Sequence, residues 1–244
     1  MPRRHVIVTG GSGGIGAATA KAFADNGDRV TIMARNTRTL DEVAKEIGAR
    51  AVRVDVSDPA SVEAAFMDAG PADVLVNCAG VARSEKLVST NVRVWEEILR
   101  VNLTGAYLCA LKVLPYMGRK GKGRIINVAS ICGLRGYRYM VAYCASKHGL
   151  VGFTRSLADE VGSQGITVNA VCPGWVDTSM TDESIALASE RTGMSPEDVR
   201  AAMLLHNPGG VLIKPETVAQ KIFELATDDA GDVNGQTFPI PEDI

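Results

Sequence analysis

The chain has 244 residues, of which 46% are hydrophobic and 22% charged, as in ordinary globular domains. Lys and Arg (26) nearly balance Asp and Glu (28), so we expect neither nucleic acid nor an anionic membrane as a partner. No apolar run approaches the roughly 18 residues of a membrane span, and the five cysteines show no metal-ligand spacing. These features predict a cytoplasmic protein with reduced thiols and no metal site.

Short aliphatic runs alternate with helical patterns along the first two-thirds of the chain. Strands are predicted at His5–Thr9, Arg29–Met33, Ala51–Val54, Val74–Val76, Arg124–Val128 and Thr167–Val171. Helices are predicted near Gly14–Asn26, Thr39–Ile47, Pro59–Ala69, Val92–Met117 and Val141–Ser163. Nearly continuous apolar strands are typical of a sheet covered on both faces, and alternating strands and helices form right-handed βαβ units. We therefore predict one α/β domain over residues 1–244, a three-layer αβα doubly wound parallel sheet (Rossmann fold).

The segment from Pro173 to Lys214 has a different composition, because strand signals are replaced there by Gly, Pro and short helical patterns. Ser195 precedes one such helix, and a second helix is predicted to follow Lys214 and reach about Ala226. Long segments without strands are often functional lids. We expect a substrate lid at about 178–213, followed by a last strand at Gln236–Pro239.

A glycine-rich run directly follows the first predicted strand and precedes a helix. It reads Thr9-Gly10-Gly11-Ser12-Gly13-Gly14-Ile15-Gly16 and fits both G-x-G-x-x-G and T-G-x-x-x-G-x-G. Glycines let the backbone approach a pyrophosphate, which the positive end of the helix stabilises. The run predicts a dinucleotide site.

The end of the second predicted strand bears on the choice of dinucleotide. An NAD site usually places Asp or Glu there for the ribose hydroxyl, whereas this chain has Arg35. A guanidinium suits a 2′-phosphate. NADP(H) is therefore favoured, with NAD(H) as the alternative.

A hydroxyl, a phenol and an ammonium are predicted to meet near this site. Tyr143 and Lys147 are four residues apart, hence on one face of a helix, and Ser130 follows the fifth strand at the ligand edge of the sheet. A phenol with a pKa of about 10 is a poor base at neutral pH. We expect Lys147, together with an oxidised nicotinamide, to lower the pKa of Tyr143 toward about 7. Ser130 would hold the oxygen of a substrate carbonyl.

From Val6 to about Thr178, and more loosely beyond, the chain resembles the short-chain dehydrogenase/reductases in their one-domain form. The resemblance depends on seven short motifs in the family's order: Thr9-Gly-x-x-x-Gly14-Ile-Gly16, Asp55-Val56, Asn77-Cys-Ala79-Gly80, Asn102, Ser130, Tyr143-x-x-x-Lys147 and Pro173-Gly174-x-x-x-Thr178. One departure is Cys78, where the family usually has a second Asn thought to brace the sheet.

The resemblance implies a role for each matching residue. Tyr143 would be the general acid/base, Ser130 would position the carbonyl, Lys147 would lower the tyrosine pKa and bind the nicotinamide ribose, and Asn102 would hold a relay water. The expected cofactor-binding residues are Gly10, Ser12, Gly13, Gly14, Ile15, Gly16, Arg35, Asp55, Val56, Asn77, Ala79, Gly80, Tyr143, Lys147, Pro173, Gly174, Val176 and Thr178. The expected substrate contacts are Ser130, Cys132, Tyr137, Tyr143 and Trp175.

These features predict an NADP(H)-dependent oxidoreductase that interconverts a ketone and a secondary alcohol, for example a 3-oxoacyl thioester reductase. Two alternatives stay open: an NAD-dependent secondary alcohol dehydrogenase of a degradative pathway, and a non-catalytic NADP(H) sensor or scaffold. The resemblance also implies a homo-oligomer, a tetramer or dimer built from the two long helices.

Overall fold

Seven parallel strands form the central sheet in the computed structural model, which describes residues 3–205 and 207–241. Across the sheet the order is β3 (Arg50–Arg53), β2 (Arg29–Ala34), β1 (His5–Thr9), β4 (Val74–Asn77), β5 (Gly123–Val128), β6 (Ile166–Pro173) and β7 (Thr237–Ile240). The chain moves outward from β1 to β3 and returns to β4, so the order reverses between β1 and β4. Ligands bind in the crevice at such a reversal. The predicted doubly wound fold is confirmed.

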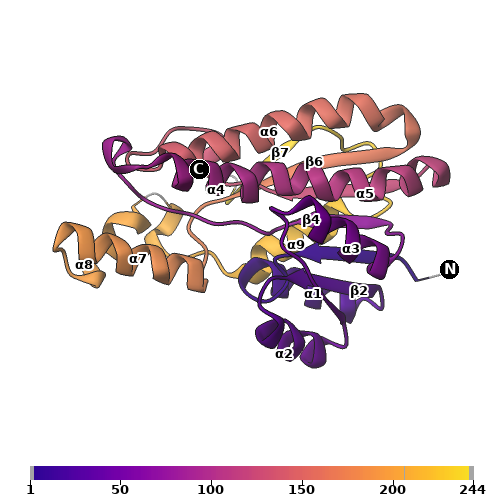
Figure 1. Ribbon diagram of the computed structural model, residues 1–244, viewed down its shortest axis with the longest axis horizontal. Coiled ribbons are helices and arrows are strands. Elements are labelled where there is room, and N and C mark those ends of the chain that lie inside the picture. Colours follow the sequence, from indigo (N-terminus) through magenta and orange to yellow (C-terminus); the bar gives the residue numbers. More distant parts are fainter. Residues whose placement is uncertain (1–2, 206, 242–244) are drawn as a thin grey trace.

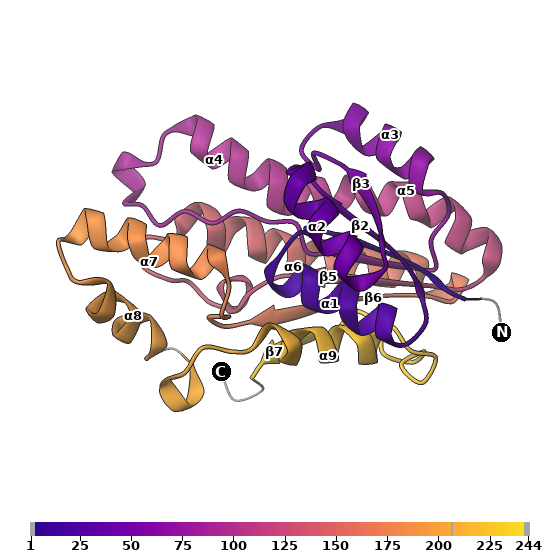
Figure 2. The ribbon, with the colours of Figure 1, turned by 90° about the horizontal axis from the view of Figure 1, so that it is seen from below.

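Helices cover both faces of this sheet (Figures 1 and 2). One layer holds α1 (Gly14–Asp25), α2 (Thr37–Ile47) and α9 (Pro215–Leu225). The other holds α3 (Pro59–Ala69), α4 (Val92–Leu99), α5 (Gly105–Lys120) and α6 (Val141–Val161). Because both faces are covered, all residues of β1, β4, β5 and β6 are buried. Rigid, fully buried strands therefore position the loops at their carboxyl ends.

Local signals in the sequence fix several helix ends as predicted. Asp58 accepts a hydrogen bond from the backbone N–H of Ala60, and Pro59 occupies the first turn of α3. Ser195 likewise accepts from the N–H of Asp198 at the start of α8 (Pro196–Leu204). Such caps satisfy backbone donors that the helix itself leaves unpaired.

The predicted helix Val92–Met117 is instead α4, a π-helical turn at Arg100–Thr104 and α5. By length and composition alone the stretch Val92–Lys120 could cross a membrane, which corrects the expectation that no segment would qualify. Core helices of soluble proteins pass the same test. Here α5 packs on the sheet with Cys109, Val113 and Met117 buried.

The predicted lid contains two helices that lie beyond the end of the sheet, α7 (Ser179–Thr192) and α8 (Figure 1). A single β-bridge between Val176 and Ile213 brings the two ends of the segment together. Residue 206 lies outside the described residues. The predicted helix from about Lys214 corresponds to α9, and the last strand is β7.

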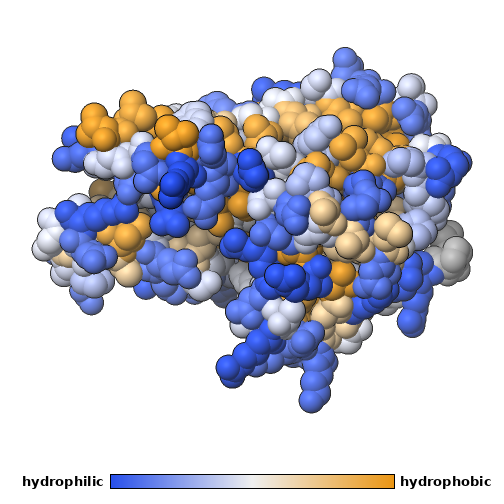
Figure 3. Space-filling model, in the orientation of Figure 1, coloured by the Kyte–Doolittle hydropathy of each residue, from blue (hydrophilic) through white to orange (hydrophobic). Residues whose placement is uncertain are grey.

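Apolar side chains remain exposed on the face formed by α4, α5 and the loop before α4 (Figure 3). Leu87, Val88 and Val92 are 62%, 93% and 69% exposed, and Tyr107 and Leu111 of α5 are nearly half exposed. A homo-oligomer built on the long helices stays a prediction.

Candidate active site

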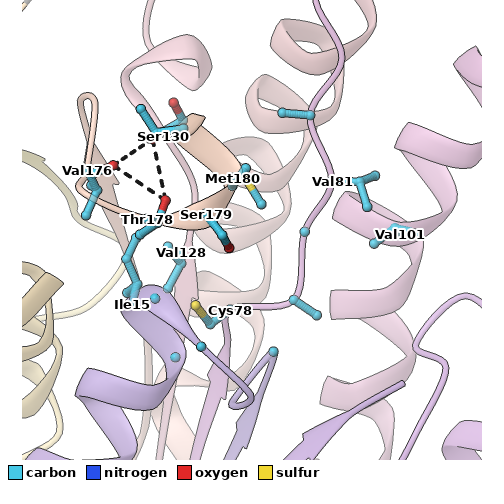
Figure 4. Close-up of a pocket in the computed structure, with 18 of the residues that line it drawn as sticks. Ile15, Cys78, Val81, Val101, Val128, Ser130, Val176, Thr178, Ser179 and Met180 are labelled. Atoms are coloured by element: carbon cyan, nitrogen blue, oxygen red, sulfur yellow. Dashed lines mark hydrogen bonds between the residues drawn. The ribbon is translucent and has the colours of Figure 1, made fainter. Parts of the chain in front are cut away.

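A cavity of about 630 Å³ opens at the carboxyl ends of the strands, on the switch point between β1 and β4. Figure 4 shows Ile15 and Thr178 on one side of this space, Val81 and Val101 on the other, and Cys78 between them. Its volume lies within the range of small-molecule and cofactor sites. The fold thus concentrates residues from the ends of six strands, β1 to β6, and from the lid around one space.

The glycine loop forms one wall of the cavity. Gly10 and Gly14 have φ angles of 70° and 51°, a region that residues with a Cβ rarely adopt. A Cβ on Gly16 would lie only 2.2 Å from the Gly10 carbonyl oxygen, so helix α1 packs against the loop in a way only glycine permits. The N-terminus of α1 has no side-chain cap and no acidic residue in its first turn. It therefore fits the pyrophosphate of a dinucleotide.

The turn after β4 lies beside the glycine loop, because Thr9 and Asn77, the last residues of β1 and β4, are register partners. The Thr9 hydroxyl accepts hydrogen bonds from the backbone N–H groups of Cys78 (3.2 Å) and Ala79 (3.3 Å). Cys78, Ala79 and Gly80 all line the cavity.

Asn77, by contrast, does not line this cavity, although it was expected to bind the cofactor. Its Nδ2 donates to Asn127 Oδ1 (2.9 Å), and Asn127 Nδ2 donates to Thr154 Oγ1 (2.9 Å). This buried chain joins β4, β5 and α6. Asn77 therefore braces the sheet. Residue 78, which the family resemblance associates with that role, is a cysteine that lines the cavity instead.

Arg35 and Asp55 lie at the end of the cavity beside β2 and β3. Arg35 is exposed and is close enough for its charge to act on Asp55. Burial alone would raise the pKa of Asp55, but hydrogen bonds from Ser57 and the charge of Arg35 hold that pKa below its ordinary value. The site therefore carries a positive and a negative group at the position where an adenosine ribose is expected.

Ser130, Tyr143 and Lys147 form the opposite wall, as predicted from their spacing. Ser130 follows β5 and accepts a hydrogen bond from the N–H of Cys132 (3.1 Å). Lys147 lies on the same face of α6 as Tyr143, with its Nζ 5.6 Å from the centroid of the phenol ring. Its ammonium donates to the Val128 carbonyl (2.8 Å). The three polar groups therefore converge at one end of the cavity.

Burial dominates the protonation of this group. It raises the pKa of Tyr143 above its usual value, and hydrogen bonding with Ser130 opposes the shift. It lowers the pKa of Lys147 to about 8. The protein groups alone thus do not produce the lowered tyrosine pKa expected from the sequence. Tyr143 instead holds its proton at neutral pH, as a general acid requires.

Lys147→Met should stabilise the fold in a pH-dependent way, because burying the ammonium costs free energy. Below about pH 8 lysine is charged in both folded and unfolded chains, and the full cost applies. Between about pH 8 and 10.5 the unfolded chain binds more protons than the folded one, so wild-type stability rises with pH. Lys147→Met should therefore exceed wild type in free energy of unfolding by on the order of 1–3 kcal/mol near pH 7, and this difference should shrink as the pH rises toward 10.

Urea unfolding of wild type and Lys147→Met at pH 7 and pH 9.5 measures this difference. Lys45→Met, at an exposed position of α2, is the control. An advantage of Lys147→Met that is the same at both pH values would contradict the prediction.

Asn102 lies in the π-helical turn and also does not line this cavity. Its side-chain amide pairs with both backbone groups of Val81: Oδ1 accepts from the N–H (2.8 Å) and Nδ2 donates to the carbonyl (2.9 Å). Nδ2 also donates to Ser146 Oγ (3.0 Å). Asn102 thus ties α6 to the loop that lines the cavity, and π turns often occur at such functional sites.

The segment after β6 closes the remaining side. Pro173, Gly174, Val176 and Thr178 line the cavity, and Thr178 Oγ1 lies 3.5 Å from the Val176 carbonyl (Figure 4). Trp175 also lines it, and its backbone N–H and carbonyl both pair with the buried Asn207 side chain. The lid is therefore fixed to the cavity wall through residue 175.

Apart from Asn77 and Asn102, every residue predicted for the site lines the cavity. Met180, an apolar lid residue expected from the sequence to face the substrate, lines the cavity. Sequence reasoning missed further lining residues that the lid and the loop before α6 supply, among them Met140, Ser179, Thr181, Glu183 and Ser184. Ser179 to Ser184 belong to the first turns of α7, and the sequence does not show which side of that helix packs toward the cavity.

Two groups of basic residues could have bound an anionic part of a substrate, Arg135 and Arg138 before α6 and the basic run 119–124, but none of these residues lines the cavity. Arg138 lies over the Tyr139 ring, and Arg135 Nε donates to the hydroxyl of Tyr137 (2.7 Å). Lys120 at the end of α5 pairs with Asp73, and Lys122 in the following loop pairs with Asp228 at 2.7 Å. These side chains therefore form ion pairs within the domain and do not reach the site.

Comparisons with known proteins agree with this geometry. The family model "short chain dehydrogenase" matches residues 4–187. The chain is 35% identical to 3-oxoacyl-[acyl-carrier-protein] reductase FabG of Escherichia coli, covering 96% of this chain and 94% of that protein. It is 40% identical to cis-4-hydroxycyclohexanecarboxylate dehydrogenase of Sinomonas cyclohexanicum, covering 97% and 94%. A crystal structure of an actinorhodin polyketide ketoreductase variant with NADPH superposes with a TM-score of 0.91 at 34% identity, covering 98% and 95%.

Proposed function

Because the chain belongs to the short-chain dehydrogenase family, we propose that it is an NADP(H)-dependent oxidoreductase that interconverts a ketone and a secondary alcohol. The observation that carries this proposal is the convergence of Ser130, Tyr143 and Lys147 on the wall of a cavity that also contains the glycine loop. A hydroxyl, a protonated phenol and an ammonium are the groups that a carbonyl needs when it becomes an alcohol.

Each residue has a distinct task in the reduction. When bound, a reduced nicotinamide supplies the hydride. The N–H of Cys132 already occupies one acceptor position of Ser130 Oγ, so the hydroxyl can donate its proton to the substrate oxygen. Tyr143 gives its own proton to the developing alkoxide. Lys147, with a pKa near 8, can then return a proton to the phenol from the interior of the protein.

The lining indicates a substrate with an apolar portion. Cys132 and Met140, which cluster with Tyr143, line the cavity together with Trp175 and Met180. Such walls favour cyclic or acyl ketones over small hydrophilic ones. The names of the similar proteins include both an oxoacyl reductase and a cyclohexane-ring dehydrogenase, which supports testing both shapes.

The function is tested by NADPH oxidation in the presence of a ketone panel. We expect turnover with an apolar probe such as cyclohexanone, ethyl acetoacetate or the N-acetylcysteamine thioester of acetoacetate. The reverse reaction is followed with the corresponding alcohol and NADP⁺. Cofactor binding without turnover of any probe in either direction would favour the sensor alternative.

Arg35→Ala should remove a preference for NADPH over NADH. The Arg35 guanidinium lines the cavity end expected to hold the ribose, where it can pair with a 2′-phosphate. We expect wild type to bind NADPH at least about tenfold more tightly than NADH, which corresponds to about 1.4 kcal/mol. The variant should lose that margin through weaker NADPH binding while its NADH affinity stays unchanged.

Titration of nicotinamide fluorescence measures both affinities. Arg38→Ala is the matched control, because Arg38 is exposed nearby on α2 and pairs with Glu42 outside the cavity. Equal or tighter binding of NADH by wild type would instead support the NAD-dependent alcohol dehydrogenase.

A further inference from the structure

The outer rim of the cavity consists of three segments that are distant in sequence. Val81 and Ala82 come from the loop after β4, Tyr137 and Met140 from the loop before α6, and α7 contributes its first turns. Each segment lacks strand pairing with the others. Their relative positions therefore depend on side-chain and loop contacts.

One arginine at the far end of α7 connects this helix to the loop after β4. Arg191 Nη2 pairs with Glu85 Oε1 at 3.0 Å, and Arg191 Nη1 donates to the Ser84 carbonyl. The Arg191 and Glu85 side chains are only 35% and 23% exposed. A planar guanidinium can bind two such acceptors at once, which a point charge cannot.

Glu85 extends the connection to the third segment. Its backbone N–H donates to the Tyr139 carbonyl at 2.7 Å. Tyr139 has a φ of 67° and is the one residue other than glycine with a positive φ among the described residues. A side-chain-bearing residue keeps this conformation only where its surroundings hold it. Tyr139 lies four residues before Tyr143, in the loop that carries the substrate-lining Tyr137.

Because the Glu85 carboxylate is partly buried, its position depends on the Arg191 charge. Glu85 Oε2 is buried and has no hydrogen-bond partner among the described residues. A partly buried carboxylate with one unpaired oxygen is costly, so the Arg191 charge is what retains it at this position. Neither Arg191 nor Glu85 lines the cavity.

We propose that Arg191 and Glu85 form a latch that holds the lid helix α7 against both rim loops, and that Arg191 is thereby a positioning residue for substrate binding. The latch sets the width of the substrate end without touching the reacting groups. Its effect on kinetics rests on the proposed function, whereas its effect on the mobility of α7 does not.

The test compares Arg191→Ala and Glu85→Gln with two matched controls on the lid, Arg200→Ala in α8 and Glu190→Gln in α7, both exposed. With ethyl acetoacetate and NADPH, or whichever panel ketone wild type reduces, we expect each latch variant to raise KM about three- to tenfold. The kcat and the NADPH Kd should stay within about twofold of wild type. The KM of Arg191→Lys should lie between those of wild type and Arg191→Ala.

Hydrogen exchange supplies a readout that needs no turnover. Backbone amides of 179–192 and 82–90 should exchange faster in both latch variants than in either control. In the double variant Arg191→Ala/Glu85→Gln these amides should exchange no faster than in the single variant that exchanges faster, because the two residues act as one unit.

Three results would overturn the proposal. Exchange in Arg191→Ala that matches Arg200→Ala would show that no latch exists. Faster exchange with an unchanged KM would remove the positioning role. A parallel loss of NADPH affinity would indicate general damage to the fold. If no ketone is reduced by wild type, the exchange comparison still decides whether the latch exists.

Discussion

Tyr143→Phe should reduce ketone turnover by about 10²- to 10⁴-fold while leaving NADPH affinity unchanged. The substitution removes one hydroxyl from the cavity wall and keeps the ring, which contributes to the buried cluster with Cys132, Met140 and Cys144. Burial keeps the Tyr143 proton in place at neutral pH, so wild type has a proton to give and the variant has none. Steady-state kinetics and a fluorescence titration of NADPH measure the two quantities separately.

Tyr137→Phe is the matched control. This phenol also lines the cavity, but its hydroxyl interacts with Arg135 at the rim. We expect its removal to alter KM more than kcat. A Tyr143→Phe enzyme that retained more than a tenth of wild-type kcat would show that another group supplies the proton.

Gly16→Ala should abolish dinucleotide binding and weaken the fold. The added methyl would lie 2.2 Å from the Gly10 carbonyl oxygen and 3.1 Å from Gly11 Cα, distances that force the loop and α1 apart. The N-terminus of α1 would then no longer face the phosphate position. We expect NADPH affinity to fall by at least about 100-fold and the free energy of unfolding by about 2–4 kcal/mol.

Gly13→Ala separates this close contact from a general effect of altering the loop. Gly13 has a φ of 175°, which any residue adopts, and a Cβ there would meet no atom within 4 Å. Its stability should match wild type within about 0.5 kcal/mol. Fluorescence titration and urea unfolding of both variants test the pair. A Gly16→Ala protein that is as stable as Gly13→Ala and binds NADPH as tightly as wild type would contradict the close-packing explanation.

The sequence alone determined the architecture and most of the site. Aliphatic runs such as Val6–Thr9 specify strands buried on both faces, and signals such as Asp58-Pro59 specify helix starts. These are local features, readable from residue type and spacing. Tyr143 and Lys147 could be placed on one helix face, and the fold rule for strand ends then brought Ser130 beside them.

Only the tertiary structure decided where several polar groups point. Asn77 ends β4 directly before the cavity-lining Cys78, yet its side chain turns to Asn127 and braces the sheet. Asn102 occurs in an ordinary helical pattern, but it lies in a π turn that no periodicity indicates, and its side chain pairs with the backbone of Val81. The direction in which a side chain points at the end of a strand or in a turn depends on backbone angles that residue types do not fix.

The charges at the site were also decided by packing. From composition, Lys147 is an ammonium with an ordinary pKa that should lower the tyrosine pKa, but burial lowers the pKa of Lys147 and raises that of Tyr143. Arg191 and Glu85 are 106 residues apart, and their pairing exists only because α7 folds back over the loop after β4. Local sequence specifies elements, whereas desolvation and contacts between distant residues arise only once those elements are packed together.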